Sequence, residues 1–192
     1  TRSGQGDRAA SELRKLAAAR PGDADVQYQY GALEFNAGNV AAAVGAFEKA
    51  WRAESGNAKY ARAYVNALVR QGRESSDNSA YSRAIEAARS LSTASATYDN
   101  VLLLGEVQLG AKQYDAAITT FGQAAAKSAS EWLPHFYAGQ AGTAAGRYAE
   151  AEAALKRALD RAGQAGDKAR IWRQLGFVYE KLNRIADAKS AY

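Results

Sequence analysis

A helix-pair motif that recurs about every 34 residues constrains this chain more than any other feature of its sequence. The motif is clearest near the C-terminal end, where Trp172-x-x-Leu175-Gly176-x-x-Tyr179 precedes Ala188 and Tyr192. A period of this length predicts a stacked array in which each helix pair contacts only its neighbours along the chain. The same positions are filled upstream by Tyr30-Gly31 with Ala43 and Phe47, by Leu104-Gly105 with Ala117 and Phe121, and by Gly139 with Ala151 and Leu155.

The small residue on the first helix of each pair fixes the register of the repeats. It is found at Gly31, Val65, Gly105, Gly139 and Gly176, so that successive steps are 34, 40, 34 and 37 residues. The two longer steps require insertions. The polar run at 73–80 has no apolar periodicity and predicts an inserted loop, and the two glycines within 161–167 predict a helix end and a connection.

Each position of the motif has a physical reason. The glycine lies beside an apolar stripe with i, i+3 and i+4 spacing, where a missing side chain lets the second helix approach closely. Glycine inside a helix costs about 0.5–1 kcal/mol relative to alanine, and close packing is the expected compensation. Large side chains on the second helices are expected to fill the space towards the next repeat, namely Phe47, Phe121, Leu155 and Tyr192. A left-handed glycine is expected to end the first helix at Gly38, Gly72 and Gly146.

The spacing and the residues of this motif resemble the tetratricopeptide repeat family. The resemblance implies an all-α fold, a right-handed superhelical solenoid of antiparallel helix pairs that extends over residues 1–192 as a single domain. The expected segments are 7–23 as the second helix of a preceding repeat, 24–57, 58–97 with the inserted loop 73–80, 98–131, 132–168, and 169–192 as a truncated fifth repeat. Because the first and last segments are half repeats, we expect a fragment of a longer protein. The alanine-rich, glycine-containing composition suggests a bacterial-type one.

Composition and charge narrow the classes of function. Apolar residues make up 47% of the chain and charged residues 23%, as in ordinary globular proteins, and no apolar stretch approaches the roughly 20 residues that span a bilayer. The net charge of +5 raises the question of nucleic acid, but basic and acidic residues alternate, as in Glu48-Lys49, which indicates solvated helix faces. RNA binding is therefore disfavoured. Cysteine is absent, which is compatible with a bacterial periplasm and a cytoplasm alike.

No pattern of catalytic or metal-binding residues is found along the chain. His135 is the one histidine, and no cysteine or second histidine accompanies it as a ligand. It occupies the repeat position of Trp172, so it is expected to be a partly buried packing residue. The sequence predicts that this segment is not an enzyme and that it holds no cofactor and no metal.

The resemblance implies a binding site in the concave groove that the first helices of the pairs line. Aromatic side chains at these positions would be costly to leave on a wet helix face, and exposed apolar clusters rimmed by charge are typical of binding surfaces. The alternative is that neighbouring helices cover the rings. The candidate residues, transferred by register, are Tyr28, Phe35, Lys59, Arg62, Asn66, Arg70, Phe136, Gln140, Arg173 and Phe177.

The candidate residues also suggest the chemistry of a partner. Arg62 and Asn66 resemble half of the clamp with which chaperone-binding members of the family hold a C-terminal carboxylate, but Asp99 and Leu103 stand where the other half would be. A protein or peptide segment with acidic and apolar residues fits better. The resemblance implies a protein–protein interaction scaffold, of the kind found in bacterial secretion, polysaccharide-export, pilus or motility assemblies. The alternatives are a structural spacer with no groove ligand and an RNA-binding helical repeat.

Overall fold

The computed structural model describes residues 2–76 and 78–192, which form eleven α-helices joined by short connections. Their bounds are α1 Arg2–Ala19, α2 Ala24–Asn36, α3 Val40–Ala53, α4 Ala58–Ser75, α5 Asn78–Ala94, α6 Tyr98–Gly110, α7 Tyr114–Lys127, α8 Leu133–Ala144, α9 Tyr148–Arg161, α10 Ala165–Lys181 and α11 Ile185–Ala191. The predicted all-α fold of packed helix pairs is confirmed.

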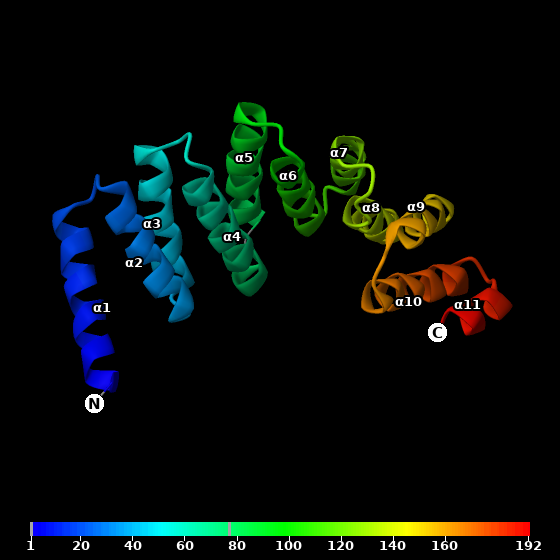
Figure 1. Cartoon of the computed structure of the whole chain (residues 1–192), viewed down its shortest axis with the longest axis horizontal. Coiled ribbons are helices and arrows are strands. Elements are labelled where there is room, and N and C mark those ends of the chain that lie inside the picture. The colour runs from blue at the N-terminus through cyan, green and yellow to red at the C-terminus, as the bar shows by residue number, and fades with distance from the viewer. Residues whose placement is uncertain (1, 77) are drawn as a thin grey trace. The chain divides into compact units, whose positions relative to one another are not determined.

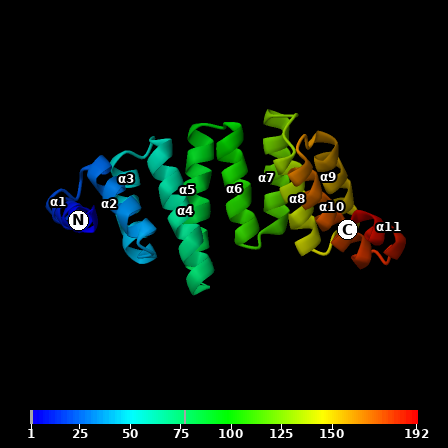
Figure 2. The same ribbon diagram turned by 60° about the horizontal axis from the view of Figure 1, so that its bottom comes forward.

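The chain divides into two compact units, and each is described by itself. The N-terminal unit, residues 1–94, contains α1 to α5, and the C-terminal unit, residues 95–192, contains α6 to α11. Within each unit the first helix of a pair packs against the second, as Figures 1 and 2 show for α2 with α3, α4 with α5, α6 with α7, and α8 with α9. We call α2, α4, α6, α8 and α10 the A helices, and α1, α3, α5, α7, α9 and α11 the B helices.

The A helix and the B helix of a pair meet where a glycine faces a large side chain. A Cβ atom at Gly31 would lie 2.7 Å from a ring carbon of Phe47, and one at Gly105 would lie 2.6 Å from Phe121. Gly139 against Leu155 and Gly176 against Tyr192 repeat this contact. The predicted close approach at glycine is therefore confirmed. The large residues fill the space above the glycine of their own repeat, rather than only the space towards the next one as predicted.

Left-handed residues end the A helices, as expected for Gly38 with φ of 83° and Gly146 with φ of 76°. The same position is filled in other repeats by Lys112 and Asn183, which have φ of 61° and 58°. Gly72 was expected to be a third such turn, and that prediction is wrong. It lies inside α4, where a Cβ atom would be 2.7 Å from the ring of Tyr81, and the left-handed residue that follows α4 is Ser76.

The predicted inserted loop 73–80 is also corrected by the structure. Helix α4 continues to Ser75 and α5 begins at Asn78, so the extra residues lengthen both helices instead of forming a loop. The contact of Gly72 with Tyr81 continues the interface of the pair into the added turns, and the ion pair of Arg70 with Glu74 at 2.7 Å supports the end of α4. Near 161–167 the predicted helix end and connection are confirmed, because α9 ends at Arg161 and α10 begins at Ala165.

Buried polar groups attach α1 to the first pair of the N-terminal unit. The side chain of Gln27 donates from Nε2 to the carbonyl oxygens of Ala17 at 2.7 Å and Arg20 at 3.1 Å. Glu34 is buried, and its carboxylate accepts hydrogen bonds from Arg14 at 2.8 Å and Asn39 at 2.6 Å. The hydrogen bond from Arg14 is the main reason that the pKa of Glu34 is lowered. These contacts satisfy groups that would be costly to bury alone.

Candidate functional site

Tyr28 and Lys59 form the first part of the predicted surface in the N-terminal unit. The half-buried ring of Tyr28 lies between the rings of Phe47, at 5.7 Å, and Tyr60, at 5.4 Å between centroids. The ammonium group of Lys59 is 4.0 Å from the centroid of Tyr28 and 3.9 Å from Asp25 Oδ1. An exposed cation on α4 thus covers an aromatic ring of α2, an arrangement worth about 0.5–1 kcal/mol at such a site.

Phe35 and Arg70 repeat this arrangement at the C-terminal end of α2. The guanidinium carbon of Arg70 lies 4.9 Å from the ring centroid of Phe35, and its Nη1 donates to the carbonyl oxygen of Phe35 at 3.1 Å. Arg62 and Asn66 lie on α4 between Lys59 and Arg70, the first half-buried and the second exposed. The six candidates of the N-terminal unit therefore lie on α2 and α4, and contacts join Tyr28 with Lys59 and Phe35 with Arg70.

Phe136 is a candidate that the structure removes from the surface. Its ring is only 3% exposed and belongs to the core of the C-terminal unit with Ile171 and Leu175. The guanidinium carbon of Arg170 lies 5.1 Å from the Phe136 ring, and Trp132 meets the same ring edge-on at 5.5 Å. Neighbouring residues cover the Phe136 ring, so the alternative prediction is confirmed at this position. Gln140, one turn further along α8, is half-buried.

The two candidates on α10 remain at the surface. Arg173 is exposed, and Phe177 is 40% exposed, which is high for a phenylalanine. The ammonium group of Lys181 lies 5.2 Å from the Phe177 ring. In the C-terminal unit the predicted surface is therefore reduced to α10 and the half-buried Gln140.

Arg170 and Trp132 are surface residues that the candidate set omitted. Arg170 occupies the same repeat position as Lys59, and Phe136 the same position as Tyr28, so a cation on one A helix covers an aromatic ring of the previous A helix in both units. The register alone could have identified Arg170. Trp132 stands four residues before Phe136, which is the spacing of neighbours on one helix face.

Two tyrosines near α8 stay neutral under ordinary conditions. Burial, followed by the charge of Glu106, raises the pKa of Tyr137 to about 12. Burial, followed by the charge of Glu131, raises the pKa of Tyr98 to about 12 as well. Both phenols therefore keep their protons near neutral pH.

His135 is half-buried on α8, as its repeat position predicted. Burial is the main cause that lowers its pKa, and the positive charges of Arg161 and Arg157 lower it further. The folded protein therefore favours the neutral imidazole. Among the described residues, no group of three or more histidine, cysteine, aspartate or glutamate side chains is placed to hold a metal ion.

The lowered pKa of His135 makes stability depend on pH. As the pH falls through about 6.5, the unfolded chain takes up a proton that the folded chain resists, so the free energy of unfolding should decrease. We expect the parent to lose more stability than His135→Asn between about pH 7.5 and about pH 5.5. Urea unfolding of both proteins at each pH measures this, and an identical pH dependence would contradict the prediction.

Comparison with known proteins places the helix pairs in a family. The profile described as "Tetratricopeptide repeat" matches residues 2–59 and 102–167. The chain belongs to the tetratricopeptide repeat family. No curated protein sequence matches it, but solved tetratricopeptide repeat structures share its fold.

Several solved structures resemble the chain over most of their length. MamA from Desulfovibrio magneticus RS-1, residues 41 to the end, has 16% identity and a TM-score of 0.71, with 88% of this chain and 90% of that chain covered. MamA of strain AMB-1 has 22% identity and a TM-score of 0.66, covering 86% and 92%. YrrB, described as a tetratricopeptide repeat protein with an unusual peptide-binding site, has 17% identity and a TM-score of 0.63, covering 95% and 89%. At these identities the likeness shows the fold alone.

None of the described helices combines the length and the apolar character that crossing a bilayer requires.

Proposed function

We propose that this chain is a protein-binding scaffold whose A helices hold a segment of a partner protein. The observation that carries the proposal is the pairing of cations on α4 with half-buried aromatic rings on α2, at Lys59 with Tyr28 and at Arg70 with Phe35. Such pairs present apolar surface and positive charge side by side, which suits a partner segment that alternates apolar and acidic residues. Membership of a family that generally mediates protein–protein interaction supports the same conclusion.

The charges of each unit favour an acidic partner. Helix α4 carries Lys59, Arg62 and Arg70 along the predicted surface, and α10 carries Arg170 and Arg173. Asp25 and Glu74 offset part of this charge in the N-terminal unit, since they lie 3.9 Å from Lys59 and 2.7 Å from Arg70. The surface should therefore prefer a few carboxylates set among apolar side chains over a uniform polyanion such as RNA.

The test is charge reversal on the A helices of both units. We expect Arg62→Glu together with Arg173→Glu to weaken partner binding by about ten-fold or more, because two attractive contacts become repulsive. Partners are first captured with the parent protein from a lysate of the source organism and identified by mass spectrometry. The affinity of each captured partner is then measured by titration calorimetry with the parent and the variant.

A matched control changes the same charge elsewhere. Lys49 and Lys127 are exposed on the B helices α3 and α7, one in each unit, so Lys49→Glu with Lys127→Glu alters the net charge equally without touching the A helices. Equal loss of affinity in both variants would show that the net charge of the protein, and not the A-helix surface, determines the affinity. No loss in the A-helix variant, at unchanged helicity by circular dichroism, would favour a spacer. An affinity that falls steeply with salt would favour RNA.

A further inference from the structure

A pocket of about 450 Å³ lies in the C-terminal unit, between the B helices α7 and α9, with α8 as its floor. We call it the α7–α9 groove. Each B helix lines it at i, i+3, i+4 and i+7 spacing, so it follows the two helices for about two turns, or roughly 10 Å. Its volume lies in the range of binding pockets. Half of the residues that line it are glycine or alanine, namely Gly122, Ala125, Ala138, Gly142, Ala153 and Ala154.

The same position in the N-terminal unit is filled by the protein itself. Between α3 and α5, with α4 beneath, Trp51 stacks on Tyr64 with ring centroids 5.3 Å apart. Arg83 lies over Tyr64, donates to its hydroxyl oxygen at 2.8 Å and pairs with Glu48 at 2.9 Å. Two aromatic rings and a salt bridge thus close the space between these neighbouring B helices.

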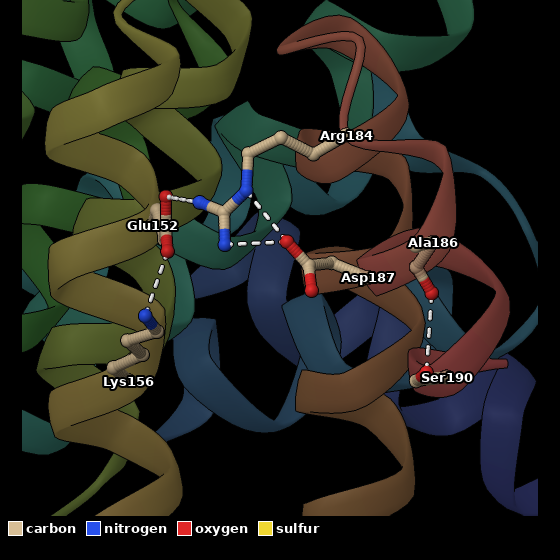
Figure 3. Close-up of polar contacts among 6 residues, drawn as sticks. All are labelled: Glu152, Lys156, Arg184, Ala186, Asp187 and Ser190. Carbon is tan, nitrogen blue, oxygen red and sulfur yellow. Dashed lines mark hydrogen bonds and ion pairs between the residues drawn. The ribbon is translucent and has the colours of Figure 1, made fainter.

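The next pair of B helices in the C-terminal unit, α9 and α11, is joined by a network of ion pairs. Arg184 at the start of α11 donates to Glu152 of α9 at 2.8 Å, and Lys156 holds the other carboxylate oxygen at 2.7 Å, as Figure 3 shows. Arg184 also pairs with Asp187 at 2.6 Å and covers the ring of Tyr179, with 4.5 Å between the guanidinium carbon and the ring centroid.

Alignment of the repeats shows what the α7–α9 groove lacks. Ala125 replaces Trp51, Ala138 replaces Tyr64, and Gly122 replaces Glu48, because Phe121 corresponds to Phe47 and Gly139 to Val65. Ala125 and Ala138 are partly exposed, and Gly122 is exposed. The space that large side chains fill in the N-terminal unit is therefore open in the α7–α9 groove, and a large side chain of another molecule could occupy it.

The charges at the two ends of the groove differ. At one end Glu150 is tied to Arg147, at 3.8 Å, and Arg147 also pairs with Asp115 at 2.5 Å. At the other end lies Arg157, which has no carboxylate partner among the residues that the structure describes. His135 stands beside it on the groove wall. This end is positively charged and open to an incoming carboxylate.

We propose that the α7–α9 groove binds a segment of a partner protein that inserts one aromatic side chain over Ala125 and Ala138 and pairs a carboxylate, about one helical turn away, with Arg157. The aromatic ring takes the place that Trp51 and Tyr64 fill in the N-terminal unit. This surface lies on the B helices, so it is separate from the A-helix surface of the proposed function. The chain would then hold two partner segments at once.

A designed peptide tests the groove directly. The probe is an acetylated and amidated alanine-based helix of about 14 residues, carrying tryptophan and, four positions later, glutamate on the same face. Binding to the full chain is followed by ¹H–¹⁵N NMR, and saturable shifts are expected at the amides of Gly122, Ala138 and Ala153. A peptide with alanine for tryptophan should cause no such shifts. A peptide with glutamine for glutamate should bind about two- to five-fold more weakly, as expected for loss of an exposed ion pair.

Two variants separate binding at the groove from binding elsewhere. Ala125→Trp with Ala138→Tyr copies the filled groove of the N-terminal unit and should abolish the saturable shifts. Ala153 is exposed, so Ala153→Glu should keep the fold, and it should weaken binding ten-fold or more by bulk and charge. The A-helix variant Arg62→Glu/Arg173→Glu should bind the peptide as the parent does, which distinguishes this site from the proposed one.

Other outcomes overturn the proposal. Absence of shifts at the groove up to millimolar peptide would do so, as would unchanged affinity in Ala153→Glu. Binding of free 3-indolepropionate as tightly as the peptide would indicate a small-molecule site instead of a docking site for a protein segment.

Discussion

Replacing Gly105 with valine is expected to lower the free energy of unfolding by about 2–3 kcal/mol, as overpacking of a core does. The first added carbon would lie 2.6 to 3.1 Å from three ring atoms of Phe121, closer than real contacts allow. That ring is fully buried and cannot swing into solvent. The helices α6 and α7 would have to separate, and urea unfolding followed by circular dichroism measures the loss.

A second glycine of the same unit provides the control for Gly105→Val. Gly122 lies inside α7, and nothing would contact a Cβ atom there within 4 Å. Gly122→Ala should therefore raise stability by about 0.5–1 kcal/mol, since only the helix propensity changes. If Gly105→Val lowers the free energy of unfolding and Gly122→Ala raises it, the close approach of the helices at Gly105 explains the loss, and the replacement of a glycine as such does not.

A natural exchange within the chain suggests how to rescue Gly105→Val. The second repeat has Val65 on its A helix and Ala88 on its B helix, both fully buried, at the positions of Gly105 and Phe121. Phe121→Ala alone should cost about 3–5 kcal/mol, because it leaves a cavity. Together, Gly105→Val and Phe121→Ala should cost at least about 1 kcal/mol less than the sum of the single changes. Strict additivity would contradict direct contact between the two positions.

The glycine contact could be predicted from sequence because both partners lie in one repeat, at a fixed separation that recurs along the chain. The helix ends at Gly38 and Gly146 were predictable for the same reason. The insertion in the second repeat was not. Its polar residues carry no apolar periodicity, yet Gly72 and Tyr81 extend the contact between α4 and α5 and keep the added turns helical. The contact of Gly72 with Tyr81 and the ion pair of Arg70 with Glu74 favour helix where the local composition predicted a loop.

The candidate site was less predictable, because exposure depends on the neighbouring repeat. Tyr28 and Phe136 occupy the same repeat position, yet one is half-buried and the other is core. The difference comes from residues outside the position itself, since Trp132 meets the Phe136 ring from the start of α8 and Ile171 packs from α10. Register identifies which positions can face a partner, but the packing of adjacent helices decides which of them do.

Because Phe136 is buried and Phe177 is exposed, replacing each with alanine should change the free energy of unfolding by very different amounts. Phe136→Ala should lower the free energy of unfolding by about 3–5 kcal/mol, because it removes a buried ring between α8 and α10. Phe177 is 40% exposed, so Phe177→Ala should cost less than about 1 kcal/mol. Urea unfolding of both variants measures the difference.

For partner binding, the substitution at Phe177 should have the larger effect and the substitution at Phe136 the smaller one. Phe177→Ala should weaken a partner captured on the A helices, because it removes exposed aromatic surface beside Arg173, whereas Phe136 has almost no surface for a partner to contact. Phe136→Leu keeps most of the buried volume and provides a folded variant in which this can be measured. If Phe136→Leu lost affinity while Phe177→Ala did not, the partner would have to displace Arg170 and reach the ring beneath it, and the site would include the core of the C-terminal unit.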